Sequence, residues 1–168
     1  GIDANTVTAA FDDNGTFTGD LGTAVVTVAN TKTLTGAANK LVNHTINKAV
    51  GGDGAVVVTL NAEADTGVNL TQLTGSAGIT SITAADSFTF AGTLHGTVAT
   101  TVADSVTFTT TALKATGKTI SDGDDTATVA ITALHSDLDA DLSGIDANTV
   151  TAAFDDNGTF TGDLGTAV

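Results

Sequence analysis

The sequence predicts an all-β protein, specifically a β-solenoid in which short strands stack coil upon coil. One observation behind this prediction is that a long segment returns unchanged, and a second is that apolar residues flanked by threonine recur at a shorter interval. A third is a composition rich in strand and turn formers. Together they indicate coils of about 18 residues, with about eight coils in each long repeat.

The long repeat is the 25-residue segment 1–25, which returns without a change as residues 144–168. Folding does not require such identity, and exact self-similarity at a fixed distance is typical of repeat architectures. We therefore interpret residues 1–143 as one full unit and residues 144–168 as the start of the next identical unit. On this interpretation the chain is expected to be a piece of a longer tandem array.

The composition fits a regular β-structure. Nineteen glycines supply turns, and the absence of proline leaves every backbone N–H free to donate in a ladder. The net charge of −14 argues against nucleic acid and anionic membrane surfaces as partners, because both attract basic patches. No apolar run is long enough to insert into a membrane. The absence of cysteine excludes disulfides and thiolate metal sites.

The shorter interval is marked by apolar residues flanked by threonine or other polar residues. The gaps between successive centres are close to the length of one predicted coil, or about twice that where one copy has drifted. We expect these centres to form one inward column, with stacked pairs such as Phe17 with Leu34 and Phe90 with Phe108. The centres are Phe17, Leu34, Leu73, Phe90, Phe108, Leu142 and Phe160.

Polar corners separate the strands. Asn, Asp and Gly at residues 12–15, 29–32, 85–87 and 103–105 provide turn chemistry. The two places where the interval doubles, residues 40–54 and 118–128, are predicted to be irregular corners or loops. A weak helical pattern covers residues 37–48. At about 4.8 Å per coil, eight coils would span roughly 38 Å.

The alternative architecture is a string of antiparallel β-sandwich domains, one in each unit. A unit of this size suits a sandwich, and alternating strands look similar in both folds. A sandwich gives no reason for apolar columns to stay in phase over a whole unit. The solenoid is therefore the preferred prediction.

Two acidic groups are candidates for calcium binding. Asp137, Asp139 and Asp141 alternate along the chain and would share one face of a strand, while Asp122 and Asp124 belong to a second acidic turn. Carboxylate oxygens are the ligands that calcium prefers. The alternative is a solvated acidic surface that keeps chains apart.

Known calcium motifs match poorly. The segment that begins at Asp137 has Leu142 where the helix-loop-helix motif needs glycine. The segment 51–56 resembles the start of a calcium-binding nonapeptide repeat, but Val56 stands where that repeat has its aspartate ligand. Calcium is thus a candidate cofactor without a diagnostic motif.

No constellation of catalytic residues is evident. His44, His95 and His135 are far apart in the sequence and no nucleophile or base motif accompanies them, so we predict that the chain is not an enzyme. Outward threonines flank several of the centres, as in Thr16 and Thr18. Such rows resemble the flat faces of insect-type ice-binding proteins, although threonine is also simply a good residue for an exposed strand.

The alphabet of Thr, Ala, Val, Asp and Gly resembles that of very long bacterial β-strand-repeat proteins, the giant adhesins and surface or sheath proteins. The segments that carry this resemblance are GIDANTVTAA, TFTGDLGTA and TLTGAANK. It implies extracellular display and frequent use of calcium. The expected function is a structural repeat segment of an extracellular filament, sheath or stalk that associates with copies of itself. The alternative is an adhesin repeat that binds a glycan, a surface or ice.

Overall fold

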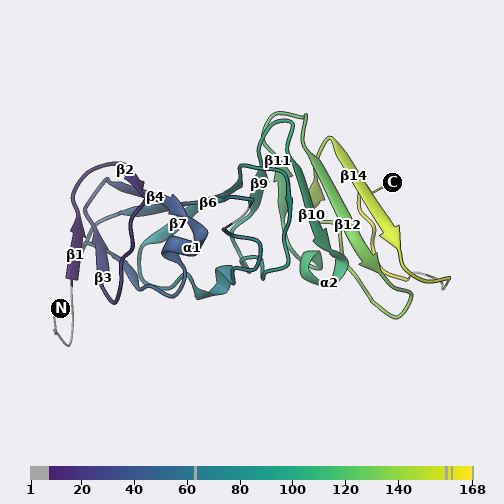
Figure 1. The fold of residues 1–168 in the computed structure, drawn as a ribbon, viewed down its shortest axis with the longest axis horizontal. Helices are drawn as coiled ribbons and strands as arrows, with labels where there is room; N and C mark the ends of the chain where they lie inside the picture. The colour runs from purple at the N-terminus through teal and green to yellow at the C-terminus, as the bar shows by residue number, and fades with distance from the viewer. Residues whose placement is uncertain (1–7, 63, 158, 160, 168) are drawn as a thin grey trace.

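The computed structural model describes residues 8–62, 64–157, 159 and 161–167. The chain winds into an elongated stack of about seven coils, with the N-terminal coils at one end and the C-terminal coils at the other (Figure 1). Every strand pair between described residues is parallel, as successive turns of a solenoid require. The predicted β-solenoid is confirmed. The sandwich alternative is wrong, because its sheets are antiparallel.

Each coil has three sides, and side 2 carries a strand in every coil. The seven strands of side 2 form one sheet whose inward residues alternate with outward ones. Its inward row from Val58 through Ile82 and Thr100 is at most 1% exposed. The strands, in spatial order, are β2 (Gly15–Phe17), β4 (Thr33–Ala37), β6 (Ala55–Leu60), β7 (Gly78–Ala84), β9 (Thr100–Val102), β11 (Ile120–Asp122) and β13 (Ile145–Asp146).

Side 1 precedes side 2 along the chain and is a sheet in the first coils only. Its strands are β1 (Thr8–Phe11), β3 (Val25–Val28) and β5 (Ile46–Lys48). Side 3 follows side 2 and is a sheet in the last coils only. Its strands are β8 (Phe88–Thr89), β10 (Thr107–Thr111), β12 (Thr128–Leu134) and β14 (Thr149–Phe154).

The side without a strand is irregular but still hydrogen-bonded to the next coil. In the early coils it is side 3, where the Thr93 amide donates to the Val68 carbonyl at 3.0 Å. In the late coils it is side 1, where the Gly117 amide donates to the Asp141 carbonyl at 2.8 Å. These irregular sides hold or adjoin three short helices: α1 (Ala38–Leu41), η1 (Leu70–Gln72) and α2 (Ala112–Ala115).

At the level of β7 the second stranded side of the coil changes from side 1 to side 3. β7 pairs with β6 along its whole length, with a bulge at the Val56/Val57 position, and its residues 82–84 also pair with β9 on the other edge. After β7 the chain turns into β8, the first strand of side 3. Residues 88–93 bond back to Thr66 and Val68 and forward to Thr109, so the irregular third side of the early coils continues as the later sheet.

The coils are longer and less uniform than the sequence predicted. On side 3 the register partner of Phe88 is Phe108 and that of Phe108 is Val129, so both steps exceed the predicted interval. Elsewhere the step is as short as that from Thr8 to Val25 and as long as that from Thr45 to Thr74. About seven coils therefore occupy the whole chain, whereas about eight were predicted for residues 1–143 alone.

The predicted single column of centres is also wrong. Leu34 lies on side 2 and Phe108 on side 3, while Leu142 lies on the irregular side 1. Phe160 lies outside the described residues. The threonine-flanked triplets mark strands on any side, and the distance between two triplets consequently does not measure one coil.

Of the two predicted stacked pairs, one is wrong and one is confirmed. The register partner of Leu34 is Gly15, whereas Phe17 lies opposite Gly36. Phe90 and Phe108 do pack together, with ring centroids 5.7 Å apart, and Phe88 packs edge-on against both. Phe90 and Phe108 are fully buried, and each such side chain contributes about 1.5–3 kcal/mol to folding.

The regions predicted to be irregular each contain a strand. Residues 40–54 include β5 and residues 118–128 include β11. The helical pattern over residues 37–48 yields only the single turn α1, because Val42 has an extended backbone and Asn43 a left-handed one with φ +66°. The predicted polar corners at residues 29–32, 85–87 and 103–105 do connect successive strands.

Candidate functional site

The first acidic candidate lies between β12 and β13. Asp137, Asp139 and Asp141 are all exposed, while Ala140 and Leu142 are buried between and beside them. They lie in the turn and loop between the two strands and not on a strand as predicted, so their sharing of one strand face stays unsupported. The Asp141 carboxylate accepts the Ser143 hydroxyl at 2.6 Å and the Ser143 amide at 3.0 Å, and these two hydrogen bonds lower the pKa of Asp141. Asp141 thus already has a role in closing a turn.

The second acidic candidate is the corner between β11 and β12. The Asp122 carboxylate accepts amides of Asp124 at 3.1 Å, Ala127 at 2.9 Å and Asn148 at 3.1 Å. Desolvation acts to raise the pKa of Asp122, but these donors outweigh it and the pKa is lowered. In the preceding coil the pKa of Asp104 is raised, first by desolvation and then by the hydrogen bond to Asp124. Two acids at this corner therefore repel each other when both are ionised.

The two acidic groups are not brought together, because the whole of β12 separates them. Within the described ranges, no three His, Asp or Glu side chains gather in a way that could hold a metal ion. Val56, at the position where a nonapeptide repeat has its aspartate, is a buried residue of β6 and 1% exposed. Calcium binding by Asp122, Asp124, Asp137, Asp139 and Asp141 stays a prediction.

Corner side chains bond to the backbone of the neighbouring coil, a role that the sequence did not reveal. Asn14 accepts the Thr33 amide at 2.8 Å, and Asp53 accepts the Thr31 amide at 2.8 Å. Corners interrupt the strand ladder, and these acceptors satisfy amides that would otherwise lose their partners. The same arrangement recurs at Asp86 with Ala62, Ser87 with Thr107, Thr126 with Ser105, and Asp156 with Ser136, and Asn47 of β5 accepts the Ser76 amide in the same way.

One acid is buried, which sequence reasoning also missed. Asp65 has no exposed surface, and its carboxylate accepts the Asn39 and Asn61 amides at 2.7 Å each. Asn39 belongs to α1 of the preceding coil, so Asp65 ties that helical turn to the loop after β6. No signal in the local sequence distinguishes Asp65 from the exposed acids.

The three histidines lie in three separate coils. His135 approaches Asp155 of the next coil, with Nε2 and Oδ2 3.9 Å apart. His95 is half-buried and its Nδ1 accepts the Thr97 and Val98 amides at 3.2 and 3.0 Å. Desolvation, followed by the nearby charge of Lys118, lowers the pKa of His95, and the two amides also need an unprotonated Nδ1.

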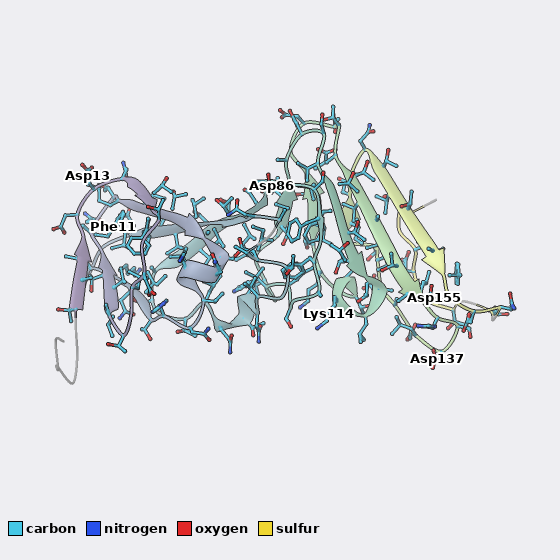
Figure 2. All side chains as sticks on the ribbon, in the orientation of Figure 1. Phe11, Asp13, Asp86, Lys114, Asp137 and Asp155 are labelled. Atoms are coloured by element: carbon cyan, nitrogen blue, oxygen red, sulfur yellow. The ribbon has the colours of Figure 1, made fainter. Side chains whose placement is uncertain are left out.

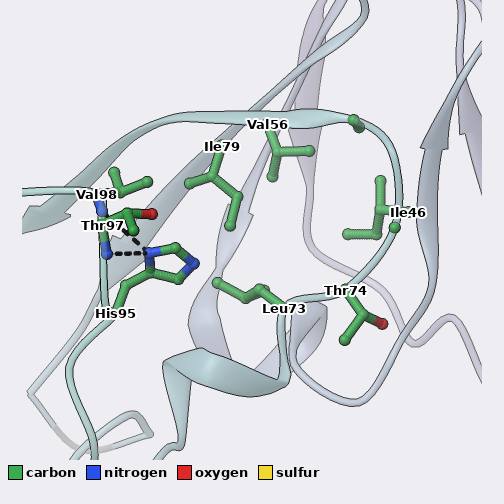
Figure 3. Close-up of a pocket in the computed structure, with 10 residues that line it drawn as sticks. Ile46, Val56, Leu73, Thr74, Ile79, His95, Thr97 and Val98 are labelled. Atoms are coloured by element: carbon green, nitrogen blue, oxygen red, sulfur yellow. Dashed lines mark hydrogen bonds between the residues drawn. The ribbon is translucent and has the colours of Figure 1, made fainter.

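His95 borders a cavity of about 310 Å³ in the side-1 ladder (Figure 3). The side chains of His95, Leu73 and Ile79 converge on it, and Ile46, Val56 and Val98 complete its apolar wall. It separates Thr74 and Gly75 from the segment 95–98, where the strands leave side 1.

Outward threonines do form rows, on side 3 and on side 2. Thr107, Thr128 and Thr149 are register partners in three successive coils, and Thr111 lies opposite Thr132. Ala130 interrupts the neighbouring row between Thr109 and Thr151. On side 2, Thr16 lies opposite Thr35 and the next position is Val57, whereas Thr59, Thr83 and Thr101 are register partners in three successive coils and Ser121 continues that row. The rows are therefore short.

Labelled acids lie along the outside of the body, with Asp13 at one end and Asp137 and Asp155 near the other (Figure 2). Comparisons with protein-family models, curated proteins and solved structures found no match to this chain. None of the helices in the described part of the chain has the length and apolarity that a membrane crossing requires. The arguments about function below rest on the fold and its surfaces.

Proposed function

We propose that the chain is a structural repeat segment of an extracellular bacterial filament, sheath or surface stalk, in which units stack end to end and carry out no catalysis. The observation that supports this most directly is the parallel ladder through all seven coils of side 2. Among the described residues, β1 pairs only with β3, and β14 pairs only with β12. An unpaired strand edge is a template for another strand.

The corner bonds suit a load-bearing role. A stack of coils resists sliding when each coil is tied to the next by backbone ladders and by side-chain acceptors at the corners. The net charge of −14 would keep neighbouring stacks apart by repulsion while allowing growth along the axis. Placement outside the cell follows from the resemblance to giant surface proteins, and its test is protease shaving of whole cells followed by mass spectrometry.

End-to-end association is tested with two matched substitutions in β1. Ala9 faces inward opposite Val26 and Ala10 faces outward opposite Thr27. We expect wild type and Ala10→Asp to form concentration-dependent stacks in sedimentation velocity and negative-stain microscopy. Ala9→Asp should block them, because it places a charge in the inward column. A wild-type chain that stays monomeric at every concentration, or stacks unaffected by Ala9→Asp, would contradict the proposal.

The threonine rows of side 3 favour adhesion as a second candidate function. A flat array of hydroxyls at regular spacing could contact a glycan, a mineral surface or ice. The test compares wild type with Thr128→Lys, at the centre of the row formed with Thr107 and Thr149, in glycan-array binding and thermal-hysteresis assays. Loss of binding in the variant would support adhesion, and the absence of binding by wild type would exclude the tested ligands.

In both candidate functions, calcium is a candidate cofactor that would stabilise the solenoid by binding its acidic groups. The test is a thermal melt with added calcium and then with EDTA, on wild type and on Asp139→Asn. A calcium-dependent rise in Tm that Asp139→Asn reduces would place an ion at the first acidic group. An unchanged Tm would leave these acids as a solvated surface.

A further inference from the structure

The two identical copies of the repeated segment lie on different sides of the solenoid. β1 belongs to the first copy and comes just before β2, the first strand of side 2. Thr151–Phe154 of β14 is the same sequence in the second copy, and it comes just after β13, the last strand of side 2. From one copy to the next, the chain therefore completes six coils and two further sides. The unit 1–143 is consequently not a whole number of coils.

We call the strand that both copies contain the shared strand: it is β1 in the first copy and residues 151–154 of β14 in the second. Between them, the two copies show a neighbour on each of its two edges. In the second copy the neighbour is β12, with Ala130 opposite Thr151 and Ile131 opposite Ala152. In the first copy the neighbour is β3, with Thr8 opposite Val25 and Ala9 opposite Val26. Because Thr8 and Thr151 are the same position of the repeat, the two registers can be joined through this one strand.

The joined register keeps every side chain on its proper face. Ile131 and Val26 are each 1% exposed, and both lie opposite the half-buried alanine that is Ala9 in one copy and Ala152 in the other. The threonine next to that alanine is exposed in both copies. A slip of one residue would turn the apolar row outward. The shared strand is therefore complementary to both neighbours at once.

The turn that follows the shared strand gives separate evidence that the second copy packs on a preceding coil. Gly22 and Gly165 both have φ +57°, but an added Cβ would meet nothing at Gly22 and would lie 2.7 Å from the Leu142 carbonyl at Gly165. The glycine is thus needed for its conformation in the first copy and also for close approach to the preceding coil in the second. The second copy shows how the first copy would sit on a preceding unit.

We infer that the partner at this end surface is another copy of the same unit, and that each unit is turned by one side, a third of a turn, relative to its neighbour. This inference rests on the proposed end-to-end stacking. The joint is one six-stranded parallel sheet, in which β14 of one unit is β1 of the next. Its strands, in order, are β8, β10, β12, the shared strand, β3 and β5.

The rotation sets the geometry of the filament. One unit of six and two-thirds coils advances about 32 Å at the usual strand spacing of about 4.8 Å. Three units restore the starting orientation after twenty coils, about 96 Å. Each surface feature of the unit, including the threonine rows, is then presented on all three sides in turn. A sheath or adhesive fibre built in this way has no single functional face.

The test is cryo-EM of a polypeptide that contains several consecutive copies of the unit 1–143. Leu113, 67% exposed on α2, is replaced by cysteine in each unit and labelled with gold, since the chain has no other cysteine. Labels that advance by about 32 Å with a third of a turn each time support the inference. A continuous solenoid with labels in line along one side overturns it and leaves the proposed filament intact. Separate beads without a continuous ladder overturn both.

A second measurement uses the 168-residue chain itself. The pair Ala10→Cys with Thr27→Cys tests the first copy on side 1, and the pair Thr128→Cys with Thr149→Cys tests the neighbourhood of the second copy on side 3. Register partners about 4.8 Å apart are within reach of a disulfide. Both pairs should oxidise to disulfides in the folded chain. Failure of either pair in a chain with native circular dichroism would overturn the assignment of the copies to different sides.

Discussion

The two copies of the repeated segment share their turn but differ in the strand before it. In both copies an aspartate accepts the amide of the glycine two positions later at 2.8 Å, and an alanine amide closes the turn on a leucine carbonyl. The residues are Asp20, Leu21, Gly22 and Ala24 in the first copy and Asp163, Leu164, Gly165 and Ala167 in the second. The hydrogen bonds within this turn depend only on its own residues.

The strand before the turn depends on its neighbour. Thr8–Phe11 forms β1 against β3, whereas the same sequence ends β14 against β12, with a bulge between the pairs that Ala152 and Phe154 make. Phe11 is half-buried, while Phe154 is 45% exposed. The comparison shows that local sequence sets the turns of this solenoid, and that the adjacent coil sets the pairing and burial of its strands.

The largest effect is expected from removing the buried phenylalanine that packs against two others. Phe108→Ala should lower the free energy of unfolding by about 3–5 kcal/mol, because the residue is fully buried and packs against Phe88 and Phe90 of the preceding coil. Phe108→Asp should be worse, since it also buries a charge. Phe11→Ala should cost less, and Phe154→Ala least. Urea denaturation of the four variants measures this series, and equal losses at all three positions would contradict the role of the adjacent coil.

The next largest loss of stability is expected from replacing the buried Asp65, compared with replacing an exposed aspartate of the repeated turn. Asp65→Ala leaves the Asn39 and Asn61 amides without their acceptor and should cost about 2–4 kcal/mol. Asp163→Ala removes a single exposed turn bond and should cost much less. Thermal denaturation of both variants provides the measurement. A small loss for Asp65→Ala would mean that water replaces the carboxylate.

A smaller effect distinguishes the two identical glycines. Gly22→Ala should cost about 1–2 kcal/mol locally, because alanine must adopt a left-handed conformation. Gly165→Ala should cost more, because its Cβ would also press on the Leu142 carbonyl. Amide hydrogen exchange at Ala24 and Ala167 reports the local loss in each copy. Equal losses would contradict the seating of the second copy on the preceding coil.

The smallest effect is a dependence of stability on pH. The pKa of His95 is lowered from 6.5, so its contribution is present above pH 6.5 and is lost as the pH falls and the imidazole is protonated. The lowered pKa values of Asp122 and Asp141 act in the same direction: their contribution to stability is lost as the pH falls below their ordinary pKa of 3.8. The raised pKa of Asp104 acts in the opposite direction. The folded protein binds this proton more tightly than the unfolded chain does, so the contribution of Asp104 to stability is lost as the pH rises.

Urea midpoints measured between about pH 8 and about pH 5 on wild type and His95→Gln isolate the histidine. Wild type should lose stability below pH 6.5 relative to the variant. Parallel pH profiles would show that the His95 contacts with Thr97 and Val98 do not contribute. Asp104→Asn should raise stability at neutral pH by removing the repulsion from Asp124, with Asp86→Asn as the matched corner control.

The sequence predicted what is local in this fold. Alternation of apolar and polar residues indicated the strands, and turn residues such as Asn30 and Asp104 indicated the corners. Asp137 and Asp139 are exposed, but they lie in a turn and loop and not on the strand that their alternation indicated. The strands and corners depend on neighbouring residues in the chain, which a single sequence contains.

Features that depend on the next coil were not predictable. The loops between register partners set the length of each coil, which is short from Thr8 to Val25 and long from Thr45 to Thr74. A mean interval between triplets consequently could not give the number of coils. The corner role of Asn14 likewise requires knowing that Thr33 lies beside it. The change of sides at β7 leaves no mark in the threonine-flanked triplets.

The central claim is that identical residues have different strand neighbours in the two copies, and backbone NMR of the 168-residue chain tests it most directly. The account predicts two separate resonances for each repeated residue, with large differences at Phe11 and Phe154 and small ones in the turn. It also predicts parallel-strand NOEs from Thr8 to Val25 and from Thr151 to Ala130. Coincident resonances for the two copies, or Hα–Hα contacts that indicate antiparallel pairing, would contradict it.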